Sequence, residues 1–233
     1  SGTIMLSNRR HVIKRLKEGL YVNTETGEIN QVTTRPKEAP RNPTSRNQSF
    51  RQLRNLIYAN FTGGGAGGEF MVTLEFTKSI DPSDLKQVKK VFKVFTETGL
   101  NRSFRQTFMQ RAAFIVIYEP HQNGQWHAHL LLKGSENAAK PIEGAALYEW
   151  LADHWTASQL TPEAFTTITS NSGLAQYFYL PSYKAKTEST SSEHIANKAR
   201  RFSYYPQGVK FWGSSRGKDN QGNPLLVQPT KET

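Results

Sequence analysis

The chain of 233 residues contains no cysteine. It therefore has no disulfide, no thiolate zinc site and no cysteine nucleophile, and a reducing compartment, the cytoplasm, is expected. It also lacks a hydrophobic run long enough to cross a bilayer and an apolar N-terminal secretory signal. These absences predict a soluble protein with no membrane partner.

Acidic residues are scarce relative to basic ones. The 19 Asp and Glu stand against 30 Lys and Arg, which leaves a formal net charge of +11. An excess of this size on a soluble chain indicates a polyanionic partner, most often nucleic acid. The alternative is a soluble protein that is basic without such a partner.

Composition divides the chain into three parts. Residues 1–68 are rich in charge and turn formers and are expected to be a basic, partly extended arm with a short helix over 50–61. The glycine run 63–68 that ends the arm lacks the Gly-Lys-Ser/Thr of a phosphate-binding loop and is interpreted as a hinge. Residues 69–218 have the pattern of a folded domain, and the polar residues 219–233 are expected to be a flexible tail.

The folded part alternates strand and helix patterns. Strands are expected over 70–76, 112–118, 125–132 and near 166–169, with Gln122-Asn123-Gly124 as a hairpin turn between the second and third. Helices are expected after Asp84 to a stop at Gly99, over 142–155 and over 172–179. This order predicts an α+β fold, in which helices pack on one face of an antiparallel sheet.

The third expected strand carries two histidines. His127 and His129 are two residues apart, so in a strand they lie on one face, while Ala128 and Leu130 face the core. The hairpin brings Glu119 onto the neighbouring strand, where its carboxylate can complete a three-ligand site for Mn²⁺, Mg²⁺, Zn²⁺ or a similar ion. The alternative is two surface histidines on an edge strand. His121, in the turn, is left out of the ligand set.

Tyrosines gather further along the chain, in the segment that also contains Lys186. Tyr179 and Tyr183 are four residues apart and share a face if the segment is helical, and Tyr177 precedes them. A tyrosinate near a metal-bound phosphate can attack phosphorus, and a lysine can stabilise the charge. The alternative is an amphipathic helix whose aromatic side chains face the core.

Taken together, these motifs resemble those of HUH endonucleases. The segments that carry the resemblance follow one another in the family's order: 71–77, 127–132, and Tyr179-xxx-Tyr183-xx-Lys186. The segment 201–217 (Arg-Phe-Ser-Tyr-Tyr-Pro-Gln-Gly-Val-Lys-Phe-Trp-Gly-Ser-Ser-Arg-Gly) resembles the stretch that follows the tyrosine motif in rolling-circle replication initiators (Rep proteins) of bacterial plasmids or phages. The resemblance covers roughly residues 70–218.

The resemblance implies a five-stranded antiparallel sheet of ferredoxin-like or RRM-like type with the histidines at its centre. It also implies a Mn²⁺- or Mg²⁺-assisted nick in single-stranded or hairpin origin DNA, a 5′-phosphotyrosine link and a 3′-OH that primes synthesis by host helicase and polymerase in the bacterial cytoplasm. His127 and His129 match the metal ligands, and Glu119 matches the third. Tyr183 with Lys186 fits the Tyr-x-x-Lys pattern. Pro181 and Ser182 depart from the pattern, so the nucleophile stays open, with Tyr183 ranked before Tyr179 and Tyr177.

Cations and aromatic residues alternate near the end of the folded part. Charge and base stacking predict DNA contacts by Arg200, Arg201, Lys210, Trp212 and Arg216. The alternative is a terminal strand with core aromatics.

Three other functions remain open. They are a relaxase or transposase of the same superfamily, an RRM-like binding module without enzymatic activity, and a histidine-triad nucleotide hydrolase. The last of these needs a third alternating histidine, and because positions 125 and 131 are Gln and Leu, the sequence disfavours it.

Overall fold

The computed structural model describes backbone for residues 3–6, 11–17, 20–23, 29–31, 43–63, 68–78, 80–135, 140–170, 174, 204–206 and 209–229, with side chains from Gln48 onward. The chain forms two compact units, Ser1–Arg41 and Asn42–Thr233. The glycine run over 63–68, interpreted from the sequence as a hinge, thus lies within the second unit and not between the two.

The first unit contains a four-stranded antiparallel sheet. Its strands pair in sequence order and are β1 (Thr3–Leu6), β2 (His11–Lys17), β3 (Leu20–Asn23) and β4 (Ile29–Gln31). These segments, expected from the sequence to belong to a partly extended arm, are paired strands of a sheet. Only Glu18 and Gly19 separate β2 from β3, and a two-residue connection with glycine is a recognised hairpin signal.

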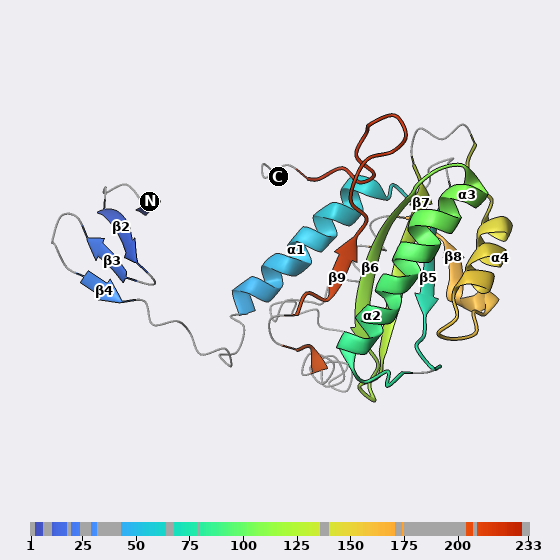
Figure 1. Cartoon of the computed structure of the whole chain (residues 1–233), viewed down its shortest axis with the longest axis horizontal. Coiled ribbons are helices and arrows are strands. Elements are labelled where there is room, and N and C mark those ends of the chain that lie inside the picture. The colour runs from blue at the N-terminus through green and yellow to red at the C-terminus, as the bar shows by residue number, and fades with distance from the viewer. Residues whose placement is uncertain are drawn as a thin grey trace, which may run out of the picture. The chain divides into compact units, whose positions relative to one another are not determined.

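The second unit is built on a five-stranded sheet with the order β8-β5-β7-β6-β9, in which all neighbours are antiparallel (Figure 1). The strands are β5 (Glu69–Leu74), β6 (Ala112–Pro120), β7 (Trp126–Gly134), β8 (Phe165–Thr167) and β9 (Trp212–Ser214). The predicted α+β fold with a five-stranded antiparallel sheet is confirmed. The histidine-bearing strand β7 lies in its middle.

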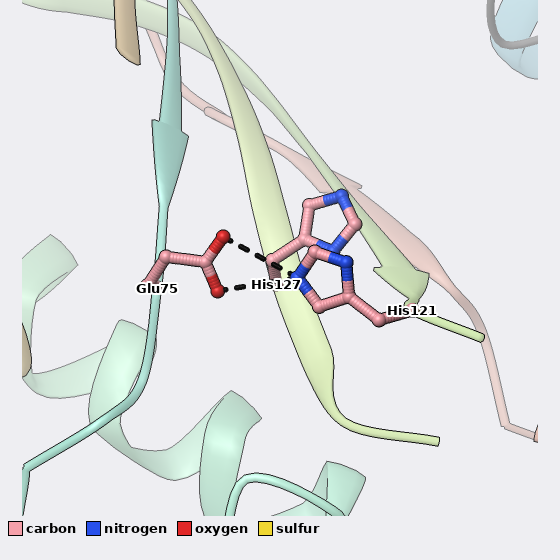
Figure 2. A group of neighbouring side chains, drawn as sticks. All are labelled: Glu75, His121 and His127. Atoms are coloured by element: carbon pink, nitrogen blue, oxygen red, sulfur yellow. Dashed lines mark hydrogen bonds and ion pairs between the residues drawn. The ribbon is translucent and has the colours of Figure 1, made fainter. Parts of the chain in front are cut away.

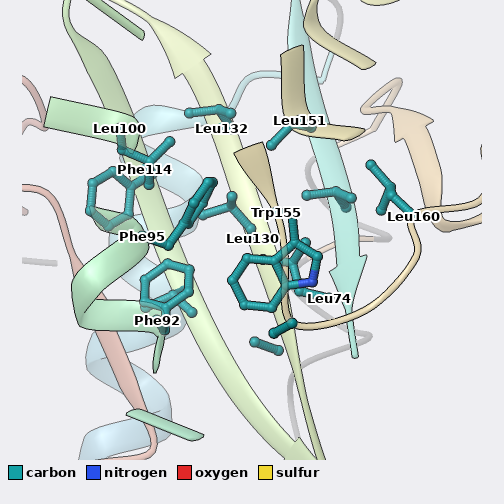
Figure 3. Packing of buried hydrophobic residues seen from close by; sticks show 14 of the residues in the cluster. Leu74, Phe92, Phe95, Leu100, Phe114, Leu130, Leu132, Leu151, Trp155 and Leu160 are labelled. Atoms are coloured by element: carbon teal, nitrogen blue, oxygen red, sulfur yellow. The ribbon is translucent and has the colours of Figure 1, made fainter. Parts of the chain in front are cut away.

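Strand alternation divides the apolar side chains between the two faces of this sheet. Ala128, Leu130 and Leu132 of β7 join Phe114 and other residues of a core beneath the helices α2 (Leu85–Phe95) and α4 (Gly144–His154), shown in Figure 3. Since side chains of a strand alternate, the odd-numbered residues of β7, including the histidines, lie on the opposite face.

The helix that begins at α2 is longer than predicted. Asp84 caps it, its carboxylate accepting hydrogen bonds from the backbone N–H groups of Lys86 and Gln87. The prediction that Gly99 ends the helix is wrong, because the chain continues through a π-helical segment, η1 (Thr96–Ser103), into α3 (Phe104–Phe108). A Cβ atom at Gly99 would lie 3.0 Å from the Phe95 ring, so glycine here permits close packing instead of stopping the helix.

A further helix covers the histidine-bearing face. In Figure 1, α2 and α4 lie in front of the sheet, and α1 (Pro43–Asn60) lies beside β9. Phe50, Leu53 and Ile57 of α1 form a second core with Ile115, Ile117 and Leu131 of the sheet. The prediction that helices pack on one face only is therefore wrong.

Part of the predicted tail belongs to this second core. Leu225 and Leu226 are buried, and the N–H of Val227 donates to the side-chain oxygen of Asn60 at 2.7 Å. The short 3₁₀ helix η2 (Pro162–Ala164) leads into β8, which is the edge strand opposite β9. None of the helices in the described part of the chain has both the length and the apolar character needed to span a bilayer.

Candidate metal centre

The hairpin between β6 and β7 positions the candidate ligands. Its turn runs from His121 to Gln125, whose carbonyl accepts from the N–H of His121 at 2.7 Å, and Gly124 donates back to the His121 carbonyl. Gly124 has φ +83°, a left-handed conformation that glycine adopts without strain. The predicted turn at residues 122–124 is confirmed, and it fixes the register of the two strands.

This register brings the three predicted ligands together. Glu119 lies directly opposite His127, and His129 lies between Ile117 of β6 and Thr73 of β5. The three side chains share the face of the sheet that α1 covers. The alternative of two histidines on an edge strand is wrong, because β7 is central and only 6% of His127 and 4% of His129 is exposed.

The ligand atoms converge on one point. Glu119 Oε2 lies 2.9 Å from His129 Nε2 and 3.4 Å from His127 Nε2, and the two Nε2 atoms are 3.0 Å apart. Atoms that each bind one ion at about 2.1 Å are separated by roughly 3.0–3.4 Å for bond angles between right-angled and tetrahedral. Two imidazole nitrogens and a carboxylate oxygen at these separations can hold one divalent cation.

The surroundings favour the protonation states that a cation requires. Burial alone would raise the pKa of Glu119, but hydrogen bonds from His127 and His129, together with their charge, hold it well below its usual range. Burial lowers the pKa of His127 against the opposing hydrogen bond to Glu119, and the charges of His129 and His121 lower it further. An ionised carboxylate and a neutral imidazole are the forms that bind metal ions.

Thr73 supports the site from β5. Its hydroxyl lies 3.3 Å from Nδ1 of His129, the nitrogen that points away from the other two ligands. When Nε2 of His129 serves a cation, Nδ1 carries the proton and donates it to the Thr73 hydroxyl. This contact orients the ring and its tautomer, as hydrogen bonds behind metal-bound histidines do in general.

A second group of possible ligands lies beside the first, and it was not among the ligands expected from the sequence. Glu75, His121 and His127 also bring ligand atoms within 4.8 Å of one another (Figure 2). Glu75 follows β5, and only the pairing of β5 with β7 brings it near the hairpin turn. Such a long-range contact leaves no signal in local spacing.

A cluster of cations lies at the β9 edge. Nζ of Lys210 sits 3.6 Å from the centre of the Trp212 ring, and Nζ of Lys89 on α2 donates to the Lys210 carbonyl at 2.9 Å. Partial burial lowers the pKa of Lys210, and the charges of Arg216 and Lys89 lower it further. Cations held this close are stabilised by an anion such as a phosphate.

The predicted DNA contacts at this edge differ in exposure. Lys210 and Arg216 are exposed, whereas Trp212 is 8% exposed and donates its indole N–H to the Ser49 hydroxyl. The Trp212 ring belongs to the second core, as the sequence alternative described. A role for Trp212 in base stacking stays a prediction.

Several predicted site residues lie outside the described residues. These are the candidate nucleophiles and their lysine, together with two predicted DNA contacts: Tyr177, Tyr179, Tyr183, Lys186, Arg200 and Arg201. Tyr118, next to Glu119, is a poor candidate for the nucleophile. It faces the core under α2, and burial raises the pKa of its phenol, which disfavours the phenolate.

No family model, curated protein or solved structure matches the chain.

Proposed function

We propose that the chain is a rolling-circle replication initiator of the HUH type, a site-specific endonuclease and ligase for single-stranded DNA. The observation that carries the proposal is the convergence of Glu119, His127 and His129 from adjacent central strands, with ligand atoms 2.9–3.4 Å apart. The excess of positive charge and the cations at the β9 edge support a nucleic-acid substrate.

Each residue of the cluster has a role in this proposal. His127 and His129 offer Nε2 lone pairs and Glu119 offers a carboxylate oxygen to Mn²⁺ or Mg²⁺. When bound, such an ion supplies Lewis-acid polarisation of a phosphate oxygen. Thr73 fixes the ring of His129, and both histidines are buried, whereas the Glu119 side chain is 19% exposed.

The covalent step is a transesterification. The phenol of a tyrosine, Tyr183 first in our ranking, gives up its proton, and its oxygen attacks the scissile phosphorus as the bond from phosphorus to the 3′ oxygen breaks. The 5′ phosphate becomes linked to tyrosine, and the departing 3′ oxygen takes a proton to become the 3′-OH. Lys186 is proposed to stabilise the charge that develops during this exchange. The reverse reaction rejoins the strand.

The 3′-OH would serve as a primer for a polymerase, with a separate helicase to unwind the duplex. A relaxase or a transposase uses the same nick and the same covalent link, so the chemistry proposed for the cluster does not depend on this biological setting. A binding module with an RRM-like sheet would bind DNA without any covalent product and without need of a cation.

The experiment that tests the proposal is capture of a covalent intermediate. The protein is incubated with a labelled pool of random single-stranded oligonucleotides and Mn²⁺ or Mg²⁺, then separated under denaturing conditions. We expect a labelled protein band that chelator abolishes, and sequencing of the captured DNA gives the cleavage site. Loss of the band in Tyr183→Phe, with retention in Tyr179→Phe and Tyr177→Phe, would support the ranking. DNA binding with no covalent band in either metal contradicts the proposal.

A further inference from the structure

The pair Glu75 and His121 lies at the open side of the metal centre. Nε2 of His121 is 3.3 Å from each carboxylate oxygen of Glu75, and both side chains are 41% exposed. Figure 2 shows the Glu75 carboxylate directed at the His121 ring, with the His127 ring behind it. The ring centres of His121 and His127 are 4.1 Å apart, so the two imidazoles are in contact.

The two ring nitrogens of His127 differ in their partners. Its Nε2 faces Glu119 and His129, as described above. Its Nδ1 is buried and has no hydrogen-bond partner within the described part of the chain. A buried polar atom left without a partner costs about 1–3 kcal/mol, so its presence calls for an explanation such as an ion.

We propose that Glu75, His121 and Nδ1 of His127 form a second, outer site for a divalent transition-metal ion, which shares His127 with the inner site of Glu119, His127 and His129. The ligand atoms of the outer group lie within 4.8 Å of one another, close enough for one ion to draw them together. Two imidazoles and one carboxylate suit Zn²⁺, Co²⁺ or Mn²⁺. The outer site does not depend on the proposed DNA nicking.

Sharing His127 couples the two sites. A neutral imidazole has one lone pair, on Nε2 or on Nδ1 according to its tautomer. With the lone pair on Nε2, His127 serves the inner site, and with the lone pair on Nδ1 it serves the outer one. An ion in either site therefore weakens binding at the other. Since Glu75 and His121 are partly exposed while His127 and His129 are buried, the outer site is also the one that an incoming ion meets first.

Titration of untagged protein with Co²⁺, followed by visible absorption and calorimetry, tests the outer site directly. In Glu119→Gln/His129→Gln the inner site is dismantled and one Co²⁺ equivalent should remain. Adding His121→Gln should weaken the binding of that equivalent at least about tenfold, because the loss of a residue that merely supports a metal ligand already costs about that much. An absence of Co²⁺ binding in the folded double variant contradicts the proposal, as does binding that is unchanged after His121→Gln.

A second variant covers the case in which the inner substitutions prevent folding. Glu75→Gln/His121→Gln alters only half-exposed side chains. Wild type should bind a first Co²⁺ and then a second about tenfold or more weakly, within the usual range of coupling between sites. The variant should lose the weaker equivalent and keep the stronger one. The control variant Glu97→Gln/His154→Gln replaces one glutamate and one histidine that belong to neither group of ligands. It should still bind both Co²⁺ equivalents. Retention of both in Glu75→Gln/His121→Gln overturns the outer site, whatever the outcome of the DNA experiment.

Discussion

Glu119 and His127 occupy directly opposed positions on β6 and β7, with Glu119 Oε2 3.4 Å from His127 Nε2. Because side chains alternate along a strand, a slip of one residue in this pairing would move Glu119 to the other face of the sheet. The geometry of the candidate metal centre is therefore set by the register of one hairpin. The turn that fixes this register is as important to the site as the ligands.

Gly124→Ala should destabilise the protein and weaken metal binding. The residue has φ +83°, which costs an L-residue about 1–2 kcal/mol, and a Cβ there would lie 3.1 Å from the Tyr204 ring. We expect a loss of roughly this size in the free energy of unfolding, measured with urea, together with weaker Co²⁺ binding because the hairpin shifts.

Gly222→Ala is the matched control for this change. Gly222 has φ +89°, yet nothing lies within 4 Å of its Cβ position. The control should lose stability because alanine disfavours a positive φ, but it makes no contact like that of a Cβ at position 124 with Tyr204. It should bind Co²⁺ as wild type does. Equal metal affinity in Gly124→Ala and wild type would mean that the turn does not set the site.

Thr73→Val should weaken metal binding with little effect on the fold. Valine has the shape of threonine but cannot accept the hydrogen bond from Nδ1 of His129, now 3.3 Å from the hydroxyl. Loss of such a supporting contact typically costs about 10–100-fold in metal affinity. Calorimetric titration with Mn²⁺ or Co²⁺ measures the change. Thr77→Val, at an exposed position just after β5, should leave the affinity unchanged, and an equal loss in both variants would remove the argument for Thr73.

Lys89→Gln and Lys210→Gln should each weaken binding to single-stranded DNA. Both residues lie at the β9 edge, where Nζ of Lys89 donates to the backbone carbonyl of Lys210 and the charges of Arg216 and Lys89 act on Lys210. Each lost phosphate contact should reduce the slope of log affinity against log salt by about 0.7. Fluorescence anisotropy at several salt concentrations measures this slope. Lys93→Gln, on the same helix and 74% exposed, is the control, and a slope unchanged in all three variants would exclude this edge from the DNA path.

Local patterns predicted the centre of the site well. The two-residue period of a strand places His127 and His129 on one face, and the turn at Gly124 returns Glu119 to the same level. Both inferences depend only on residues within one hairpin. For the same reason the core residues Ala128 and Leu130 could be assigned to the opposite face.

Contacts between distant segments could not be predicted in this way. Glu75 reaches His121 only because β5 pairs with β7, and α1 covers the histidine-bearing face only through packing of residues such as Leu53. The prediction that Gly99 ends the helix was wrong for a different reason. Glycine usually disfavours a helix, but here the close approach of the Phe95 ring outweighs that preference.

The most direct test of the account is a comparison of His129→Ala with His154→Ala in covalent capture of single-stranded DNA. His129 belongs to the candidate metal centre, whereas His154 lies on α4 and contacts Ser103 and the Trp150 carbonyl. We predict that His129→Ala forms no covalent product yet keeps most of its salt-dependent DNA affinity, while His154→Ala still forms the product. Full covalent capture by His129→Ala would contradict the role assigned to the metal centre.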